Sequence, residues 1–85
     1  MSKQFFCYIL FLPSQDTYYI GSTGNLDDRI FRHNKGWSKS TKFGAPNWKL
    51  VYKESFSSRS EAVKREQFFK RMKSKRFIQS LIKPS

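Results

Sequence analysis

The sequence predicts an α+β protein, an α/β sandwich with a three-stranded antiparallel sheet flanked by about three helices in the order β-β-α-β-α-α. Two apolar, aromatic-rich runs near the start are separated by four turn-forming residues, as in a β-hairpin. A third run of β-forming residues follows at Trp48–Phe56. Most of the remaining apolar residues recur at helical spacing. At 85 residues the chain is long enough for one modest core, so we expect a single domain over residues 1–85.

The first two strands form the predicted hairpin. The first strand is expected from about Gln4 to Leu12, and its nearly continuous apolar character is typical of a central strand covered on both faces. Pro13–Asp16 supplies the turn, and the second strand is expected at Thr17–Ile20. This pairing should bring Tyr8 and Tyr19 close together.

The first helix is predicted at Leu26–Lys35. Gly21 is expected to let the backbone turn away from the second strand. Asn25 is a good N-cap, and Gly36 is expected to end the helix. One face of this helix carries residues at i, i+4 and i+7, which are Leu26, Ile30 and His33.

The second half of the chain is predicted to add a loop, a strand and two helices. Trp37–Asn47 is rich in Gly, Pro, Ser, Thr and Lys, which predicts a loop, and Trp48–Phe56 should complete the antiparallel sheet. The serine and glutamate of Ser58–Glu61 have the spacing of a capping box and open a helix that is expected to reach about Met72. The basic segment Lys73–Lys83 has apolar residues at helical spacing, so we expect a third helix packed on the sheet.

The charge balance indicates a polyanionic partner. There are 17 Lys and Arg residues against 6 Asp and Glu, a formal net charge of +11, which favours nucleic acid. A membrane surface is disfavoured because the basic residues are interleaved with elements that the core requires. The basic run Lys64–Lys83 by itself is typical of a solvated helical face. Together with the aromatic hairpin and the basic loop, it indicates phosphate binding.

The lone cysteine and the lone histidine exclude two classes of site. They allow no internal disulfide and no four-ligand zinc site, so Cys7 is expected to be a small buried strand residue. Lys3 precedes an apolar run as short as a signal-peptide core, but no small-residue cleavage site follows. No segment approaches the roughly 18 apolar residues of a membrane span. We therefore expect an intracellular protein.

Two short elements near the start resemble a known signature. Cys7–Ile9 and Tyr19–Gly21, with ten residues between their tyrosines, are similar to the paired motifs of the GIY-YIG nuclease superfamily, although the first reads Cys-Tyr-Ile rather than Gly-Ile-Tyr. Arg29, His33 and Glu66 follow in the family's order. The chain most resembles the small stand-alone bacterial members. The resemblance therefore implies a GIY-YIG-like nuclease domain in the bacterial cytoplasm.

The resemblance implies metal-dependent cleavage of a DNA phosphodiester with a single Mg²⁺ or Mn²⁺ ion. Glu66 is the implied metal ligand. Its helical spacing from Ala62 and Phe69 places it at the edge of the apolar face, where a carboxylate must be paired or bound. Its alternative role is an i, i+4 ion pair with Lys70.

The other implied catalytic residues are Arg29, Tyr8, Tyr19 and His33. Arg29 would stabilise charge on the scissile phosphate; its alternative role is a surface ion pair. Tyr8 is assigned as the general base and Tyr19 as the residue that orients water, with the reverse assignment left open. Because a free phenol has a pKa near 10, the basic tyrosine is expected to have its pKa lowered by the metal or by Arg29. His33 has either a direct role or that of a satisfied core residue.

Nucleic-acid contacts are expected around the second strand, the loop and the second helix. Ser38–Thr41 matches a Ser-Lys-x-Thr loop of the small bacterial members. Trp37 or Trp48 could stack on a splayed base, although Trp48 at a strand start is more typical of a core. The expected contact residues are Gly21, Ser22, Lys39, Thr41, Lys42 and Lys70.

Three function classes stay open at this point. The preferred hypothesis is a Mg²⁺-dependent endonuclease that acts on branched, flapped or damaged DNA in repair or recombination. The second is a catalytically inactive nucleic-acid-binding module with a protein partner that sets substrate choice. The third is an RNA-binding protein. Cleavage that depends on Glu66 would separate the first from the second.

Overall fold

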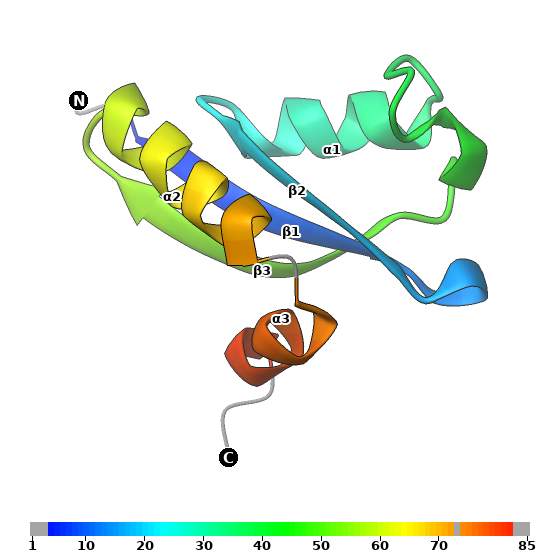
Figure 1. Cartoon of the computed structure of the whole chain (residues 1–85). Helices are drawn as coiled ribbons and strands as arrows, with labels where there is room; N and C mark the ends of the chain where they lie inside the picture. The colour runs from blue at the N-terminus through cyan, green and yellow to red at the C-terminus, as the bar shows by residue number, and fades with distance from the viewer. Residues whose placement is uncertain (1–3, 73, 83–85) are drawn as a thin grey trace.

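The computed structural model describes residues 4–72 and 74–82 and has the predicted architecture. Three antiparallel strands lie in the order β2-β1-β3, and the elements follow the chain order β-β-α-β-α-α apart from two short 3₁₀ turns. Helix α1 lies on one side of the sheet and α2 on the other (Figure 1). The strands are β1 (Phe5–Leu12), β2 (Thr17–Thr23) and β3 (Lys49–Phe56), and the helices are α1 (Leu26–Asn34), α2 (Arg59–Met72) and α3 (Lys75–Ile82).

Strand β1 is central and is buried on both faces, as predicted. Its side chains alternate between two cores because successive residues of a strand point to opposite faces. Tyr8, Leu10 and Leu12 pack with Leu26 and Trp48 on the α1 side. The other core joins β1 to α2 and α3 and contains the buried residues Cys7, Ile9, Phe69 and Ile78. Cys7 is completely buried, which confirms its predicted place in the core, and burial raises the pKa of its thiol to about 12, so the thiol stays protonated.

The β1–β2 hairpin is longer than predicted. Strand β2 continues to Thr23 rather than ending near Ile20, and Gly21 pairs with Tyr8 inside the ladder. The prediction that Gly21 turns the backbone is therefore wrong. The ladder persists because β1 begins at Phe5 and offers pairing partners as far as the Phe6–Thr23 pair.

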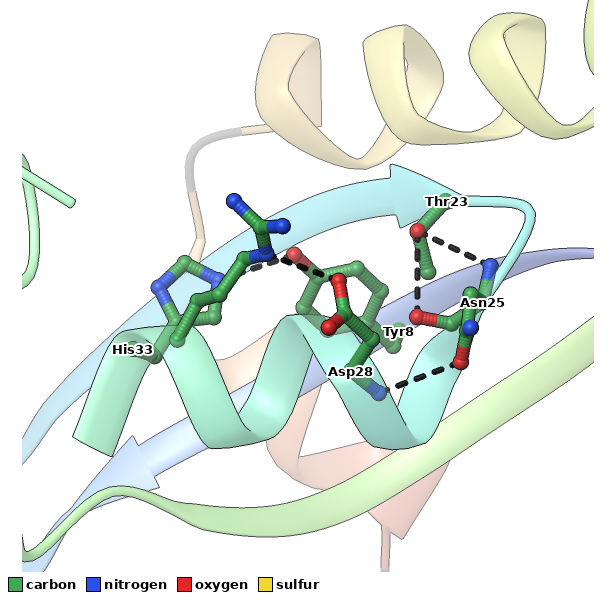
Figure 2. Close-up of polar contacts among 6 residues, drawn as sticks. Tyr8, Thr23, Asn25, Asp28 and His33 are labelled. Carbon is green, nitrogen blue, oxygen red and sulfur yellow. Dashed lines mark hydrogen bonds and ion pairs between the residues drawn. The ribbon is translucent and has the colours of Figure 1, made fainter. Parts of the chain in front are cut away.

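The caps of α1 follow the sequence prediction closely. The Asn25 side chain accepts a hydrogen bond from the backbone N–H of Asp28 at 3.1 Å, and Thr23 Oγ1 in turn accepts from the backbone N–H of Asn25 (Figure 2). The helix ends at Asn34, one residue earlier than predicted, and Gly36 adopts φ +77° just beyond it.

The segment between α1 and β3 is mostly loop, as predicted, and includes a 3₁₀ turn at Lys42–Gly44. It is tied to α1 by the Asn34 side chain, which donates to the Trp48 carbonyl at 3.0 Å and accepts from the Trp48 N–H at 2.9 Å. The indole N–H of Trp48 donates to the Thr41 carbonyl at 2.7 Å. Trp48 is buried, which confirms its predicted core position.

The last two helices also begin and end near the predicted residues. Ser58 Oγ accepts from the Glu61 N–H at 3.2 Å, the first half of the predicted capping box, and α2 ends at Met72. Helix α3 packs on the sheet through Ile78. The predicted helix ends Lys73 and Lys83 lie outside the described residues. Among the described helices, none has both the length and the apolar character that crossing a membrane requires.

Candidate active site

A buried chain of three polar side chains connects β1, α1 and the loop that follows α1. The Tyr8 hydroxyl lies 3.0 Å from His33 Nε2, and His33 Nδ1 lies 2.6 Å from Thr41 Oγ1. Figure 2 shows the Tyr8 hydroxyl directed from the sheet toward His33 on α1. Tyr8, His33 and Thr41 are each 1% exposed or less. Both nitrogens of the His33 ring are therefore occupied by protein partners.

Burial sets the protonation states of Tyr8 and His33. It raises the pKa of Tyr8 well above its ordinary value; the nearby Tyr19 and Glu66 add to this effect, and Arg29 opposes it. Burial also lowers the pKa of His33, and Arg29 lowers it further. At neutral pH the protein by itself therefore holds a neutral phenol against a neutral imidazole. Arg29 acts on the pKa of Tyr8 in the expected direction, but burial outweighs the effect of that charge, so the pKa of Tyr8 is raised in the protein by itself.

Tyr19 lies beside Tyr8 and His33, as the hairpin predicted. The ring centroids of Tyr8 and Tyr19 are 6.4 Å apart, and Tyr19 meets the His33 ring edge-on at 4.8 Å. Its side chain is half-buried, whereas that of Tyr8 is fully buried. Tyr19 is therefore the more accessible of the two tyrosines.

Gly21 provides the space that the Tyr8 hydroxyl occupies. A Cβ atom at this position would lie 2.6 Å from Tyr8 Oη and 2.7 Å from Cζ, closer than real Cβ contacts come. Its backbone has no left-handed torsion, so the requirement for glycine comes from this close approach rather than from a turn. Gly21 is also buried, so it shapes the site around Tyr8 instead of standing open to a phosphate.

Glu66 extends from α2 toward the end of β2. Its Oε1 accepts a hydrogen bond from the Ser22 hydroxyl at 2.6 Å, and its Oε2 pairs with Lys70 Nζ at 2.6 Å. The Glu66 side chain is 17% exposed and that of Lys70 is 53% exposed. The alternative i, i+4 ion pair with Lys70 is thus formed. Ser22 donates a hydrogen bond to the carboxylate, and its contact with nucleic acid stays a prediction.

Arg29 lies on the exposed side of α1, and its guanidinium is unpaired among the described residues. Within residues 4–72 and 74–82 this group makes no hydrogen bond or ion pair. Arg65, by contrast, binds Glu54 through two nitrogens at 2.8 and 3.2 Å. Arg29 is close enough to affect the pKa of both Tyr8 and His33, so its charge acts at the same place.

The donor set fits a hydrated Mg²⁺ ion better than a transition metal. The described residues contain no group of three His, Cys, Asp or Glu side chains that could enclose a metal. Mg²⁺ commonly binds proteins through one or two carboxylates and keeps water or phosphate oxygens at its other positions. Glu66 is a partly exposed carboxylate of this kind, and its partner Lys70 is exposed enough to move aside.

The predicted nucleic-acid contacts fall into two groups. Lys39, Lys42 and Lys70 are exposed, and Lys70 is paired with Glu66. Thr41 is completely buried, so the prediction that it contacts a phosphate is wrong; its hydroxyl instead reaches His33. Sequence reasoning did not find this link, because a threonine in a polar loop gives no signal of the ring that it will meet.

Replacing Thr41 with valine should lower stability and release the His33 ring. Valine keeps the branched shape but removes the Thr41 hydroxyl, the one partner of the buried Nδ1 atom among the described residues, a loss of about 1–3 kcal/mol of unfolding free energy. Urea unfolding measures the cost, and ¹⁵N NMR of the imidazole reports the tautomer. Thr41→Ser, which keeps the hydroxyl, should restore the imidazole signals. Unchanged signals in the valine variant would contradict the assignment.

Known proteins share the sequence pattern of this chain. Residues 4–79 match the model of the GIY-YIG catalytic domain. A UPF0213 protein of Staphylococcus haemolyticus is 44% identical over 69% of this chain and 73% of its own length. Another, from Pediococcus acidilactici, is 37% identical over 91% of this chain and 80% of its own length.

A solved structure extends the likeness to the fold. The solution NMR structure of a UPF0213 protein from Bacillus halodurans is 29% identical, covers 93% of this chain and 82% of that one, and superimposes with a TM-score of 0.58. The family match spans nearly the whole chain and includes both tyrosine motifs, Arg29, His33 and Glu66. The chain therefore belongs to the GIY-YIG catalytic-domain family, and its relatives are small bacterial UPF0213 proteins.

Proposed function

We propose that this protein is a Mg²⁺-dependent endonuclease that hydrolyses DNA phosphodiester bonds. One observation carries the proposal: Gly21 of β2 faces the Tyr8 hydroxyl, the next residue, Ser22, holds the Glu66 carboxylate at 2.6 Å, and the Arg29 charge acts on the same hydroxyl. The hydroxyl, the carboxylate and the guanidinium come from β1, α2 and α1. Phosphoryl transfer requires a proton acceptor, a metal ligand and a cation for the phosphate, and these are the chemical types brought together here.

Glu66 and Arg29 are the groups proposed to meet the scissile phosphate. Glu66 would hold Mg²⁺, which would supply positive charge against the phosphate oxygens and against the leaving oxygen. The unpaired Arg29 fork can bind two phosphate oxygens at once. Ser22 orients the Glu66 carboxylate through its hydrogen bond. Lys70 neutralises Glu66 in the free protein and would become available for a neighbouring phosphate if Glu66 held the metal.

Tyr8 and His33 are proposed to act together on the proton of the attacking water. In the tautomer with the proton on Nδ1, His33 donates to Thr41, and its Nε2 accepts the hydrogen bond of the Tyr8 hydroxyl. Tyr8 can then pass its proton to Nε2 while its oxygen accepts one from water, so the net proton ends on the imidazole. The half-buried Tyr19, whose ring centroid lies 6.4 Å from that of Tyr8, would orient the water.

The proposed substrate is branched, flapped or damaged DNA. A chain of this size with net charge +11 has many groups for phosphates but no apparent module for reading base sequence. Affinity should therefore come mainly from phosphate contacts, and specificity from the shape and deformability of the DNA.

A cleavage panel tests this function directly. We expect nicking of flap, fork or gapped DNA in Mg²⁺, little cleavage of intact linear duplex, and complete loss of cleavage when EDTA removes the metal. The same substrates made in RNA serve as the control at one stated salt concentration. Binding without cleavage of any DNA structure would instead indicate the inactive binding module, and tighter binding of structured RNA would indicate the RNA-binding alternative.

A further inference from the structure

An exposed patch of aromatic and basic side chains lies at the C-terminal end of α1, outside the site described above. We call it the aromatic patch; it consists of Phe31, Arg32, Lys35 and Trp37. The two rings meet edge-on with centroids 5.6 Å apart, yet Phe31 is 50% and Trp37 is 65% exposed. The Arg32 guanidinium lies 6.0 Å from the Trp37 ring and the Lys35 ammonium 5.3 Å from the Phe31 ring.

The backbone holds Trp37 in place. The N–H of Gly36 donates to the His33 carbonyl at 3.2 Å, and that of Trp37 donates to the Arg32 carbonyl at 3.1 Å. With φ +77° at Gly36, this is the Schellman arrangement, which often brings an apolar contact between the two ends of the turn. The apolar contact typical of this motif explains why the Phe31 and Trp37 rings touch. An aliphatic residue would satisfy it equally well, so it does not account for a large exposed indole.

We propose that the aromatic patch binds unpaired bases of single-stranded nucleic acid by stacking. Every base has a π face, and aromatic side chains flanked by cations are the usual platform for single strands. Lys35 makes no ion pair within the described residues, whereas Arg32 forms an ion pair with Asp28 at 2.7 Å. Exposed Lys39 and Lys42 follow in the adjoining loop and provide further positive charge for the sugar–phosphate backbone.

The chemistry of the patch distinguishes among occupants. In an intact duplex the faces of the bases are stacked on one another, so no base face is exposed on which the Trp37 indole could stack. An apolar protein surface would have to desolvate Arg32 and Lys35 as well as the rings, which is costly without acidic partners. A single strand meets both requirements, because its bases cover the rings while its phosphates neutralise the cations.

The position of the patch specifies the substrate of the proposed nuclease, and this step rests on the proposed function. Arg29 lies on α1, and Trp37 lies just beyond the last residue of that helix, Asn34, where it folds back onto Phe31. The patch therefore adjoins the helix that carries the cation proposed to bind the scissile phosphate. The inferred substrate carries an unpaired segment next to the phosphate that is cut, as a flap or a gapped duplex does.

Replacing Trp37 with leucine tests the proposal without any cleavage. Leucine keeps the apolar contact with Phe31 but removes the π face. Oligothymidylate of about ten nucleotides, titrated in EDTA at one stated salt concentration, should bind about tenfold more weakly to this variant. Trp37→Phe should retain most of the affinity, and affinity for a blunt duplex should be unchanged in both variants.

Tryptophan fluorescence provides a second readout. Trp37 is exposed and Trp48 is buried, so stacking on Trp37 should quench the wild-type emission, and Trp37→Leu should remove that quenching while leaving the Trp48 signal. Equal oligothymidylate affinity and no quenching would overturn the proposal. So would a Trp37-dependent self-association with unchanged oligothymidylate binding. Neither result depends on catalysis: a protein that binds through Trp37 but never cleaves would refute the nuclease alone.

Discussion

Replacing Glu66 with glutamine is expected to reduce DNA cleavage by roughly a hundred- to a thousandfold. Glutamine has nearly the same shape, and its carbonyl oxygen can still accept the Ser22 hydrogen bond. It removes the negative charge that would hold Mg²⁺, and no cluster of His, Cys, Asp and Glu in the described residues could replace it. Single-turnover nicking of a flap substrate measures the loss. DNA affinity should not fall, because Lys70 is released from its ion pair.

Glu61→Gln is the matched control for this variant. Glu61 lies in the first turn of the same helix and is exposed. The Glu61→Gln substitution removes the same charge from the chain without changing the contacts of Ser22 or Lys70, so cleavage should stay at the wild-type rate. Equal rates for Glu66→Gln and the wild type would refute the assigned metal ligand. Equal losses in both variants would point to net charge rather than to a specific site.

Replacing Gly21 with alanine is expected to impair both stability and cleavage. The new methyl group would need to lie 2.6 Å from Tyr8 Oη, and because the Tyr8 ring is buried, its displacement would require neighbouring side chains to move as well. Overpacking of this kind costs about 1–3 kcal/mol of unfolding free energy. Displacement of the hydroxyl would also lengthen the bond to His33 Nε2, so the cleavage rate should fall even where the protein is fully folded.

Gly36→Ala separates these two effects. A Cβ atom there meets its nearest neighbours at 3.7 and 3.8 Å, but φ +77° is unfavourable for alanine. Its cost of about 1 kcal/mol therefore comes from the backbone alone. Urea unfolding of both variants, with ¹⁵N NMR of His33, should show a perturbed imidazole only in Gly21→Ala. Wild-type imidazole signals and cleavage in Gly21→Ala would contradict the role assigned to this glycine.

The fold could be predicted from local patterns because each pattern acts within a few residues. The turn residues between β1 and β2, the Asn25 cap and the positive φ at Gly36 satisfy the backbone where they stand. The continuous apolar run of β1 likewise required cover on both faces, and two cores provide it. Predicted boundaries therefore differ by a residue or two, except for β2, whose length depends on the start of its partner.

The family resemblance identified the candidate catalytic residues but not what they contact. The bond between Tyr8 and His33 spans 25 residues, and that between Ser22 and Glu66 spans 44. Such contacts depend on how α1 and α2 pack on opposite faces of the sheet, which no local pattern specifies. The same packing buries Thr41 against His33. It also gives Gly21 a different role from the predicted turn: the missing side chain leaves room for the Tyr8 hydroxyl, because a closely packed interior has no other space for it.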